Sequence, residues 1–528
     1  MKNFIKKIVS DTSRLITLAL FISVGCQDFL DKKPQGQLLQ ASFPVSASDA
    51  LLVNNAAYAS IRNWYFHSGG YPILDIMSDD ARKGSSPADQ LNTVGPYDNF
   101  TINTKQDGLD RWWSAAYQSI RSANVVIKYV PTIAMRDSMK NQYLAEAKFL
   151  RGIVYFDLVR AWSGVPLVTT PDPPLGLGNA TADEIYTQII EDLKFAVAYL
   201  PKQSTYSPSN LGRATQGAAN AYLAKAYLFK KDYFNAEKYA LEVINSGQYS
   251  LEPDFNNANG LAGNFGVESI FEIGALPNDG NENGGDQYAN TQGIRGSPNR
   301  GWGFNRPSVD LINSFEPNDP RKDATVIFLG EILAGITTIG DGTSPDTTKV
   351  NGVIIEIECY NQKVWVPGNT TNSQWGHHRR LMRYADVLLI AAEASNENGK
   401  PAQALLYLNK VRLRARGGNA TILPDITQTN QGLLRDIILN ERRHELALEG
   451  HRYWDLVRTG KATTILGPLG YTAKYELLPI PQTQLDLSQG RLKQNAGWNN
   501  HSTDLKRPMY RRNQLLLQCI VSAGTGSK

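Results

Sequence analysis

Cysteine is scarce in this chain of 528 residues. Only three are present, Cys26, Cys359 and Cys519, an odd and widely separated set. A disulfide framework needs an even set of cysteines, and a zinc ribbon needs CxxC pairs, of which the sequence has none. The sequence therefore excludes both kinds of small cross-linked domain, and Cys26 needs a different explanation.

An excess of one charge is also missing from most of the chain. The formal net charge is +4, but basic residues in the first 25 positions and in the last thirty account for it. The body between them is slightly negative. Because nucleic-acid binding relies on a basic surface, the sequence gives no electrostatic reason to expect a nucleic-acid partner.

Catalytic signatures are absent as well. There is no GxSxG elbow and no Walker loop, and His444-Glu445 begins an HExxH pattern that fails because Leu448 stands at the second histidine. The stretch 279–290 has an EF-hand-like start, but it ends in Asn290 instead of glutamate and lacks flanking helices. We expect no enzyme activity, no cofactor and no metal, although a pair of glycosidase carboxylates cannot be recognised from spacing.

The N-terminus has the pattern of an export signal. Four basic residues precede or border an apolar run at 15–22, which is shorter than the ~20 residues that span a bilayer. Ser23-Val24-Gly25-Cys26 follows and resembles a bacterial lipobox, with Ser23 where leucine is usual. We expect residues 1–25 to be a lipoprotein signal peptide and Cys26 to be acylated, which would anchor the chain in a membrane.

Helical periodicity dominates the rest of the chain, which predicts an all-α fold. Two segments share a register in which a small residue on one helix is followed twelve positions later by an alanine on the next. These pairs are 224 with 236 and 392 with 404, and they resemble tetratricopeptide helix pairs, which stack into a superhelical scaffold. Further helices are expected at 49–63, 111–129, 139–162, 182–200 and 433–449.

Long loops rich in Gly, Asn and Asp separate these helices, mainly at 66–108, 163–181, 251–308 and 330–378. Alternation at 355–359 and at 364–366 predicts a short β-hairpin around Asn361-Gln362. Long loops on a rigid scaffold are typical of binding surfaces.

Charged residues on the expected helices form a separate set. The helix at 433–449 carries acidic residues at four-residue spacing, with Gly450 as its expected C-terminal cap. Opposite charges beside a Tyr-Trp cluster usually form a structural network. We therefore predict that the following residues join helices and do not touch a ligand: Arg151, Asp157, Glu441, Arg442, Glu445 and Asp455.

Five stretches in order resemble the SusD/RagB family of outer-membrane nutrient-binding lipoproteins. They are AEAKFLRGIVYFDLVR at 145–160, GWGFNRPS at 301–308, LMRYADVLLIAAE at 381–393, ERRHEL with DLVR within 441–458, and LPIP with LKQN within 478–495. The resemblance covers about residues 26–498. It divides the body into an N-terminal helical part (26–250), a loop-rich insert (251–378) and a C-terminal helical part (379–498).

The resemblance implies a function in nutrient uptake. It implies an oligosaccharide ligand, a SusC-type TonB-dependent transporter as partner, and a lipid-anchored position on the outer membrane facing the exterior. The basic tail at 499–528 departs from the family and is expected to be disordered. A surface glycoside hydrolase on a helical scaffold and a protein-interaction scaffold remain as alternatives.

Aromatic side chains inside the long loops are the best candidates for ligand contact, because such rings have no helix face to pack against. Trp112 and Trp113 are excluded because they open a helix. We predict that at least two of Tyr97, Tyr288 and Trp302 converge on one exposed face. The candidate ligand-binding residues are Tyr97, Tyr288, Arg295 and Trp302, with Trp64 and Tyr65 at the end of the first helix.

Overall fold

The computed structural model describes residues 43–67, 75–174, 176–276, 287–342, 347–366 and 376–498. The predicted signal peptide and Cys26, most of the EF-hand-like stretch, and the tail at 499–528 lie outside these residues. Within them, helices predominate and strands are short, so the expected all-α class with a loop-rich region is confirmed. No helix of the described part is long and apolar enough to cross a membrane.

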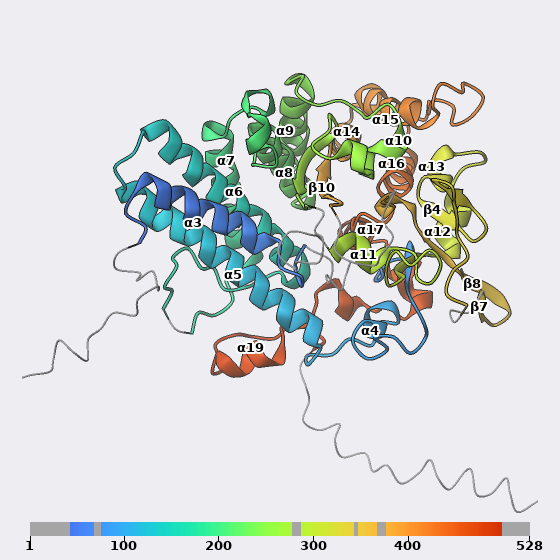
Figure 1. Cartoon of the computed structure of the whole chain (residues 1–528), viewed down its shortest axis with the longest axis horizontal. Coiled ribbons are helices and arrows are strands. Elements are labelled where there is room, and N and C mark those ends of the chain that lie inside the picture. The colour runs from blue at the N-terminus through green and yellow to red at the C-terminus, as the bar shows by residue number, and fades with distance from the viewer. Residues whose placement is uncertain are drawn as a thin grey trace, which may run out of the picture.

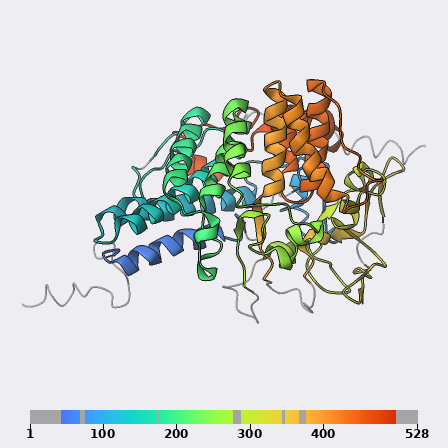
Figure 2. The ribbon, with the colours of Figure 1, turned by 90° about the horizontal axis from the view of Figure 1, so that it is seen from above.

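In the described part of the chain, nine long helices form a continuous layered body in which each packs against the next long helix. They run from the blue end on the left of Figure 1 to the orange end at the top, and Figure 2 shows several of them side by side from above. Their bounds are α3 (Ala47–Ile61), α5 (Asp107–Tyr129), α6 (Asp137–Trp162), α7 (Ala182–Tyr199), α8 (Gln216–Phe229), α9 (Tyr233–Asn245), α14 (Tyr384–Glu397), α15 (Pro401–Ala415) and α16 (Gln431–Leu446).

Local sequence explains where these helices begin. Ser46 and Asp49 form a capping box at the start of α3, and Thr181 and Glu184 form another at the start of α7. Each box satisfies backbone N–H groups that have no partner in the first turn. The α7 helix ends just before Pro201, as the sequence predicted.

The two predicted helix pairs are present as α8–α9 and α14–α15. The four small residues that define their common register, Ala224, Ala236, Ala392 and Ala404, are all fully buried. Helix α9 also packs on α14, so the two pairs are adjacent in one stack although about 140 residues separate them. Side chains this small let the antiparallel helices approach closely.

Tryptophans fill the core where α5 meets α6. The rings of Trp112 and Trp113 lie 4.5 Å and 5.2 Å from the ring of Trp162, and all three are buried. Their exclusion from the ligand surface is therefore supported. The Trp162 Nε1 atom donates to the Pro479 carbonyl at 2.9 Å, which fastens the C-terminal segment to this core.

The described residues contain five separate two-stranded antiparallel sheets, each with at least one strand in the loop-rich insert, which is green to yellow in Figure 1. The pairs are β1 (Ala81–Gly84) with β3 (Phe304–Pro307), β2 (Ser269–Ile273) with β10 (Arg379–Arg383), β4 (Val326–Phe328) with β9 (Cys359–Asn361), β5 (Ile332–Leu333) with β6 (Ile336–Thr337), and β7 (Thr347–Val350) with β8 (Val353–Ile357).

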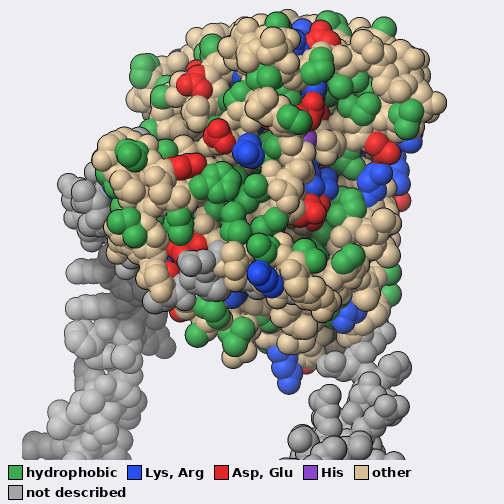
Figure 3. Space-filling model, turned by 90° about the vertical axis from the view of Figure 1, so that its right-hand side faces the viewer, with side chains coloured by type: hydrophobic (Ala, Val, Ile, Leu, Met, Phe, Trp, Pro, Cys, Tyr) green, Lys and Arg blue, Asp and Glu red, His purple; other side chains and the backbone are tan. Residues whose placement is uncertain are grey.

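Short helices complete the connections between the long ones. They are α4 (Gly95–Asp98), α10 (Phe255–Asn259), α11 (Gln287–Gln292), α12 (Val309–Ser314), α13 (Pro320–Asp323), α17 (Arg452–Arg458), α18 (Ala462–Leu466) and α19 (Gln482–Leu487). Among the described residues on the face in Figure 3, acidic and basic side chains are interspersed with hydrophobic ones, without a large patch of one sign.

The predicted hairpin around Asn361-Gln362 is wrong in its pairing. Strand β8 pairs with the preceding β7 through a turn at Asn351-Gly352, and both turn residues have positive φ, +50° and +81°. Asn-Gly is the typical sequence of such a two-residue turn. Residues Gln362–Val364 instead form a 3₁₀ turn, and β9 pairs with the distant β4.

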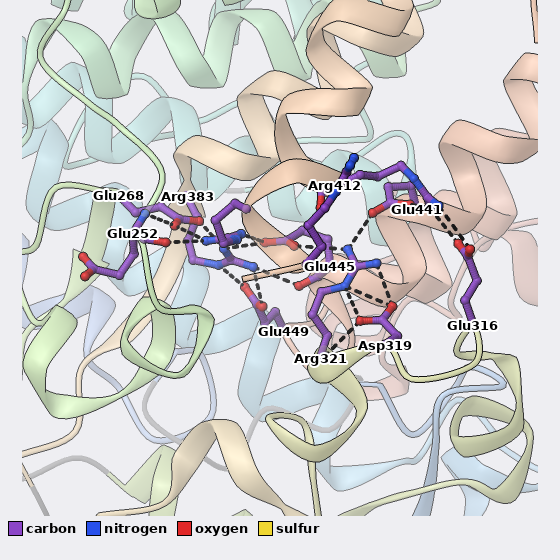
Figure 4. A network of polar contacts seen from close by, with 12 residues as sticks. Glu252, Glu268, Glu316, Asp319, Arg321, Arg383, Arg412, Glu441, Glu445 and Glu449 are labelled. Carbon is purple, nitrogen blue, oxygen red and sulfur yellow. Dashed lines mark hydrogen bonds and ion pairs between the residues drawn. The ribbon is translucent and has the colours of Figure 1, made fainter. Parts of the chain in front are cut away.

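A buried network of charges joins α16 to the loop-rich region (Figure 4). Glu445 binds Arg383 at 3.1 Å and also pairs with Arg414, while Glu441 binds Arg321 at 2.6 Å and Arg412 at 2.8 Å. All six side chains are buried. The prediction that Glu441 and Glu445 join elements of the fold is confirmed.

The other predicted structural charges are also paired and buried. Their partners are Asp192 for Arg151, His67 and Arg160 for Asp157, and Asp386 and Asp455 for Arg442. Helix α16 ends at Leu446, earlier than predicted, so Gly450 lies beyond its cap.

Candidate ligand-binding site

The structure places two of the three proposed loop rings in the interior. Tyr97 is fully buried in α4, and Tyr288 is 5% exposed in α11, where its hydroxyl donates to the Leu448 carbonyl at 3.3 Å. Each loop contains a short helix, and the tyrosine ring lies on the buried face of that helix. The prediction that two of these rings converge on an exposed surface is therefore wrong.

Trp302 and Arg295, by contrast, lie together. Both are half-buried and line a groove of about 540 Å³ in the loop-rich region. The loop before α4 contributes Ser85, Asp89 and Gln90 to the lining, and Asp341 adds a further carboxylate. The groove thus joins three segments that are far apart in the sequence.

Two further aromatic rings extend from Trp302. The Trp302 ring lies 5.6 Å from the ring of Trp64, which lies 6.4 Å from the ring of Tyr65. The guanidinium of Arg111 lies 4.8 Å from the centre of the Tyr65 ring. The three rings are half-buried, so each retains exposed surface. The three rings form a row that begins at the groove and ends at Tyr65, where Arg111 of α5 covers one ring face.

Ion pairs hold the Arg295 side chain in a fixed position. Its guanidinium donates to the Ser85 hydroxyl at 2.8 Å, pairs with Asp89, and binds Asp341 at 3.0 Å. The hydrogen bond from Ser85, together with the charge of Arg295, holds the pKa of Asp89 below its usual value. Asp89 is therefore ionised at neutral pH, and the groove presents oriented polar groups beside the ring of Trp302.

Two glycines allow the walls of the groove to meet. Gly84 and Gly303 both have positive φ, and a Cβ atom on Gly84 would lie 2.4 Å from the Gly303 carbonyl oxygen. That oxygen accepts a hydrogen bond from the Ser85 N–H at 2.7 Å. A side chain at residue 84 would separate β1 from the loop that carries Trp302.

The arrangement is suited to binding. Asp89 and Asp341 both pair with Arg295, so each has an evident role in orienting that side chain. In the described ranges, no group of three or more His, Cys, Asp or Glu side chains could hold a metal ion. Rings with an open face and oriented hydrogen-bonding groups are the features of a small-molecule site.

Comparison with known proteins agrees with this architecture. The model described as "SusD family" matches residues 267–476, and the model described as "Starch-binding associating with outer membrane" matches residues 28–228. The chain belongs to the SusD/RagB family. The first match contains Arg295 and Trp302, and the second contains Trp64 and Asp89, so the groove lies between two segments that family models recognise separately.

Known relatives extend over nearly the whole chain. SusD-like protein P2 of Formosa agariphila is 29% identical over 513 residues, which cover 91% of this chain and 98% of that protein. A solved laminarin-binding SusD-like protein is 29% identical with a TM-score of 0.73, covering 86% of this chain and all of that one. Surface glycan-binding protein A of Bacteroides thetaiotaomicron, in complex with laminarihexaose, is 25% identical with a TM-score of 0.69, covering 85% and 100%.

Family membership decides between binding and catalysis. The relatives are described as SusD-like or surface glycan-binding proteins, and this SusD/RagB chain is likewise non-catalytic. The alternative of a surface glycoside hydrolase is therefore set aside. The tetratricopeptide-like helix pairs belong to the same SusD/RagB architecture and need no separate protein-scaffold function.

Proposed function

We propose that this SusD/RagB protein binds an oligosaccharide in the groove at Trp302 and passes it to a SusC-type TonB-dependent transporter. The observation that carries the proposal is the row of half-buried rings, Tyr65, Trp64 and Trp302, that ends at a groove with oriented polar groups. The length of this row of rings suits a ligand with several repeating units better than a single small metabolite.

Elementary chemistry supports this choice of ligand. The C–H faces of a sugar ring pack against an aromatic ring, while its hydroxyls need donors and acceptors nearby. Asn299 and Gln90 offer carboxamides at the groove, and Arg295 and Asp89 offer fixed charges. Two solved relatives are described as binding laminarin or laminarihexaose, so laminarihexaose is the first ligand to test.

The double variant Trp64→Ala/Trp302→Ala tests the groove. Because each aromatic contact is worth about 0.5–1.5 kcal/mol, we expect the affinity for the bound oligosaccharide to fall roughly ten- to a hundred-fold. Isothermal titration calorimetry with laminarihexaose and a panel of other glycans measures this loss. The melting temperature should change little, because both rings are only half-buried.

Tyr199→Ala is the matched control, since Tyr199 is a 46% exposed ring on α7, outside the groove. It should bind with unchanged affinity. Equal affinity of the double variant and the original chain for every glycan that the original chain binds would refute the groove as the ligand site.

The lipid anchor is the second part of the proposal. The description of one of the two matching family models includes association with the outer membrane, and Cys26 stands at the end of the signal-like segment. We infer that acylation of Cys26 holds the chain on the outer membrane, facing the exterior. Cys26→Ser should therefore move the protein from the detergent phase to the aqueous phase in Triton X-114 partitioning. Persistence in the detergent phase would contradict the anchor.

The transporter partnership can be tested separately. An affinity tag on the full chain, expressed in its own cells, should recover a TonB-dependent transporter from solubilised outer membranes. Recovery should survive Trp64→Ala/Trp302→Ala, because we place the transporter contact outside the groove. Absence of any such transporter from the recovered proteins would contradict this part of the proposal.

A further inference from the structure

A second cavity lies within the helical layer and shares no lining residue with the groove. It occupies about 420 Å³ between the C-terminal end of α7, the first turns of α8 and the later turns of α9. Its lining is rich in carboxamides, from Gln203, Gln216, Asn220, Asn245 and Gln248, with Tyr239 beside them. Asn220 is the buried member of this lining, while the other four carboxamides are half-buried or exposed, so the cavity is a pocket open to the surface.

Two of these carboxamides are incompletely satisfied. Asn220 is 6% exposed, and its side-chain oxygen has no hydrogen-bond partner; the buried side-chain oxygen of Gln203 also lacks one. A buried acceptor without a donor is energetically unfavourable, because it has lost its hydrogen bond to water and gained none in the protein. Both oxygens belong to residues that line the cavity, so a ligand there could supply the missing donors.

Neighbouring carboxamides are already held in place. The Gln216 Nε2 atom donates to the Val197 carbonyl at 3.1 Å, and Gln248 Oε1 accepts from the Ser204 N–H at 3.0 Å. The Tyr239 ring is stacked on Tyr227, with 5.6 Å between centroids and 2° between planes. Side chains fixed in this way lose little conformational entropy when a ligand binds.

Charge and shape narrow the class of ligand. Only Lys202 and Glu242 carry charge in the lining, they are of opposite sign, and both side chains belong to exposed residues. A carboxamide both donates and accepts, as does each hydroxyl of a sugar. An extended peptide would require a channel along several helix pairs, whereas this lining comes from one end of α7–α9 and the segments beside it.

We propose that this cavity is a second binding site, which takes a neutral polyhydroxylated ligand the size of a mono- or disaccharide. Adjacent hydroxyls of the ligand would donate to the free oxygens of Asn220 and Gln203. The site is independent of the groove at Trp302, and a chain with both sites could hold two parts of one glycan or two separate ligands.

The test uses the full chain in a detergent without a sugar headgroup. The double variant Trp64→Ala/Trp302→Ala first removes two aromatic rings of the groove site, so that any remaining sugar binding must come from elsewhere. Saturation-transfer NMR with glucose, galactose and laminaribiose at millimolar concentration should still detect binding. Adding Asn220→Leu or Gln203→Ala should weaken that binding about fivefold or more, on the order of one lost hydrogen bond.

The controls separate binding from folding. Asn220→Leu keeps the number and branching of the side-chain heavy atoms and removes an unsatisfied acceptor, so its melting temperature should not fall, and Gln203 lies in a short surface turn. Gln118→Ala, at an exposed position on α5, should have no effect on binding. The proposal is overturned if the double variant binds none of the sugars, or if both cavity variants bind them unchanged.

Two further results have distinct meanings. A capped neutral peptide that binds in an Asn220-dependent manner, with no sugar binding, would also overturn the proposal and assign the cavity to a polypeptide. If instead Trp64→Ala/Trp302→Ala leaves laminarihexaose affinity unchanged while Asn220→Leu abolishes it, the cavity proposal stands and the groove proposal fails.

Discussion

At the scale of single residues, Asp75 is a carboxyl group in an unfavourable environment. It is fully buried, and burial together with the nearby Asp80 raises its pKa to about 8, although the Gly450 N–H at 3.0 Å, Asn305 and Lys363 act in the opposite direction. In the folded protein Asp75 is therefore protonated at neutral pH. In the unfolded chain the same group is ionised, since its usual pKa is about 4.

The difference in the pKa of Asp75 between the folded and unfolded states determines how stability changes with pH. Between about pH 4 and pH 8 the folded state keeps a proton that the unfolded state releases, so this group's contribution to stability falls as pH rises. Asparagine cannot titrate, so Asp75→Asn lacks this pH dependence. Relative to the original chain, we expect the melting temperature of Asp75→Asn to rise as the pH increases from 5 to 8. Melting curves at four or five pH values measure the difference.

Asp107→Asn is the control for this comparison, because Asp107 is exposed on the first turn of α5. Its melting temperature should follow that of the original chain at every pH. Parallel curves for Asp75→Asn and the original chain would show that Asp75 does not hold a proton in the folded state.

Residue roles could be predicted unevenly from the sequence. Charges on long helices were assigned correctly, because their spacing indicates internal pairing. The positions of the Tyr97 and Tyr288 rings were predicted wrongly, because a loop-like composition surrounds the short helix that contains each ring. One signal was available, since Pro96 stands at the first turn of α4 directly before Tyr97, a typical position for proline at a helix start.

At the scale of elements, small residues determine how closely the helices pack. Ala404 on α15 is fully buried, whereas Ala402, two positions earlier on the same helix, is exposed. Leucine at 404 would force α15 away from its neighbours, and overpacking of this kind typically costs about 1–3 kcal/mol. We expect Ala404→Leu to lower the free energy of unfolding by about that amount in urea denaturation.

Ala402→Leu makes the same chemical change on the exposed side of α15 and should alter stability by less than about 0.5 kcal/mol. Similar losses in the two variants would mean that helix propensity, and not the close approach of α14 and α15, determines the cost.

Helix positions and the shared register followed from periodicity and small residues. Strand pairing did not follow from the sequence. The turn at Asn351-Gly352 was a local signal for one pairing, but the alternation at 355–359 suggested a different hairpin. Strands β1 and β3 pair Ala81 with Pro307, and β2 and β10 pair Ile273 with Arg379. Such contacts depend on how the whole helical body brings the loops together.

At the scale of the whole molecule, the charge network around α16 connects the helical body with the loops. Burial raises the pKa of Glu445, but Arg414, Arg383 and Arg321 lower it below the usual value, so the carboxylate stays ionised. Removing its charge leaves buried guanidinium groups with too few partners. We expect Glu445→Gln to cost about 3–5 kcal/mol of stability, measured by urea denaturation.

Asp436 provides a control on the same helix. Its carboxylate binds Lys461 at 2.7 Å, but the Asp436 side chain is 58% exposed. Surface pairs contribute at most about 1 kcal/mol, so Asp436→Asn should change stability little. A Glu445→Gln variant that is as stable as Asp436→Asn would show that the network is dispensable for the fold.

The position of α16 also has a consequence for the order in which the protein folds. Arg443 donates to Asp80 at 2.6 Å across 363 residues of chain, and Arg452 reaches Asp79 across 373. Synthesis proceeds from the N-terminus, so these aspartates and the loop beside the groove emerge long before their arginine partners exist. The helices of the first half can assemble early from local contacts, whereas these ion pairs next to β1 cannot form until the last hundred residues arrive. Chains truncated before α16 would therefore retain the early helices but lack the ion pairs that tie Asp79 and Asp80 to the C-terminal part.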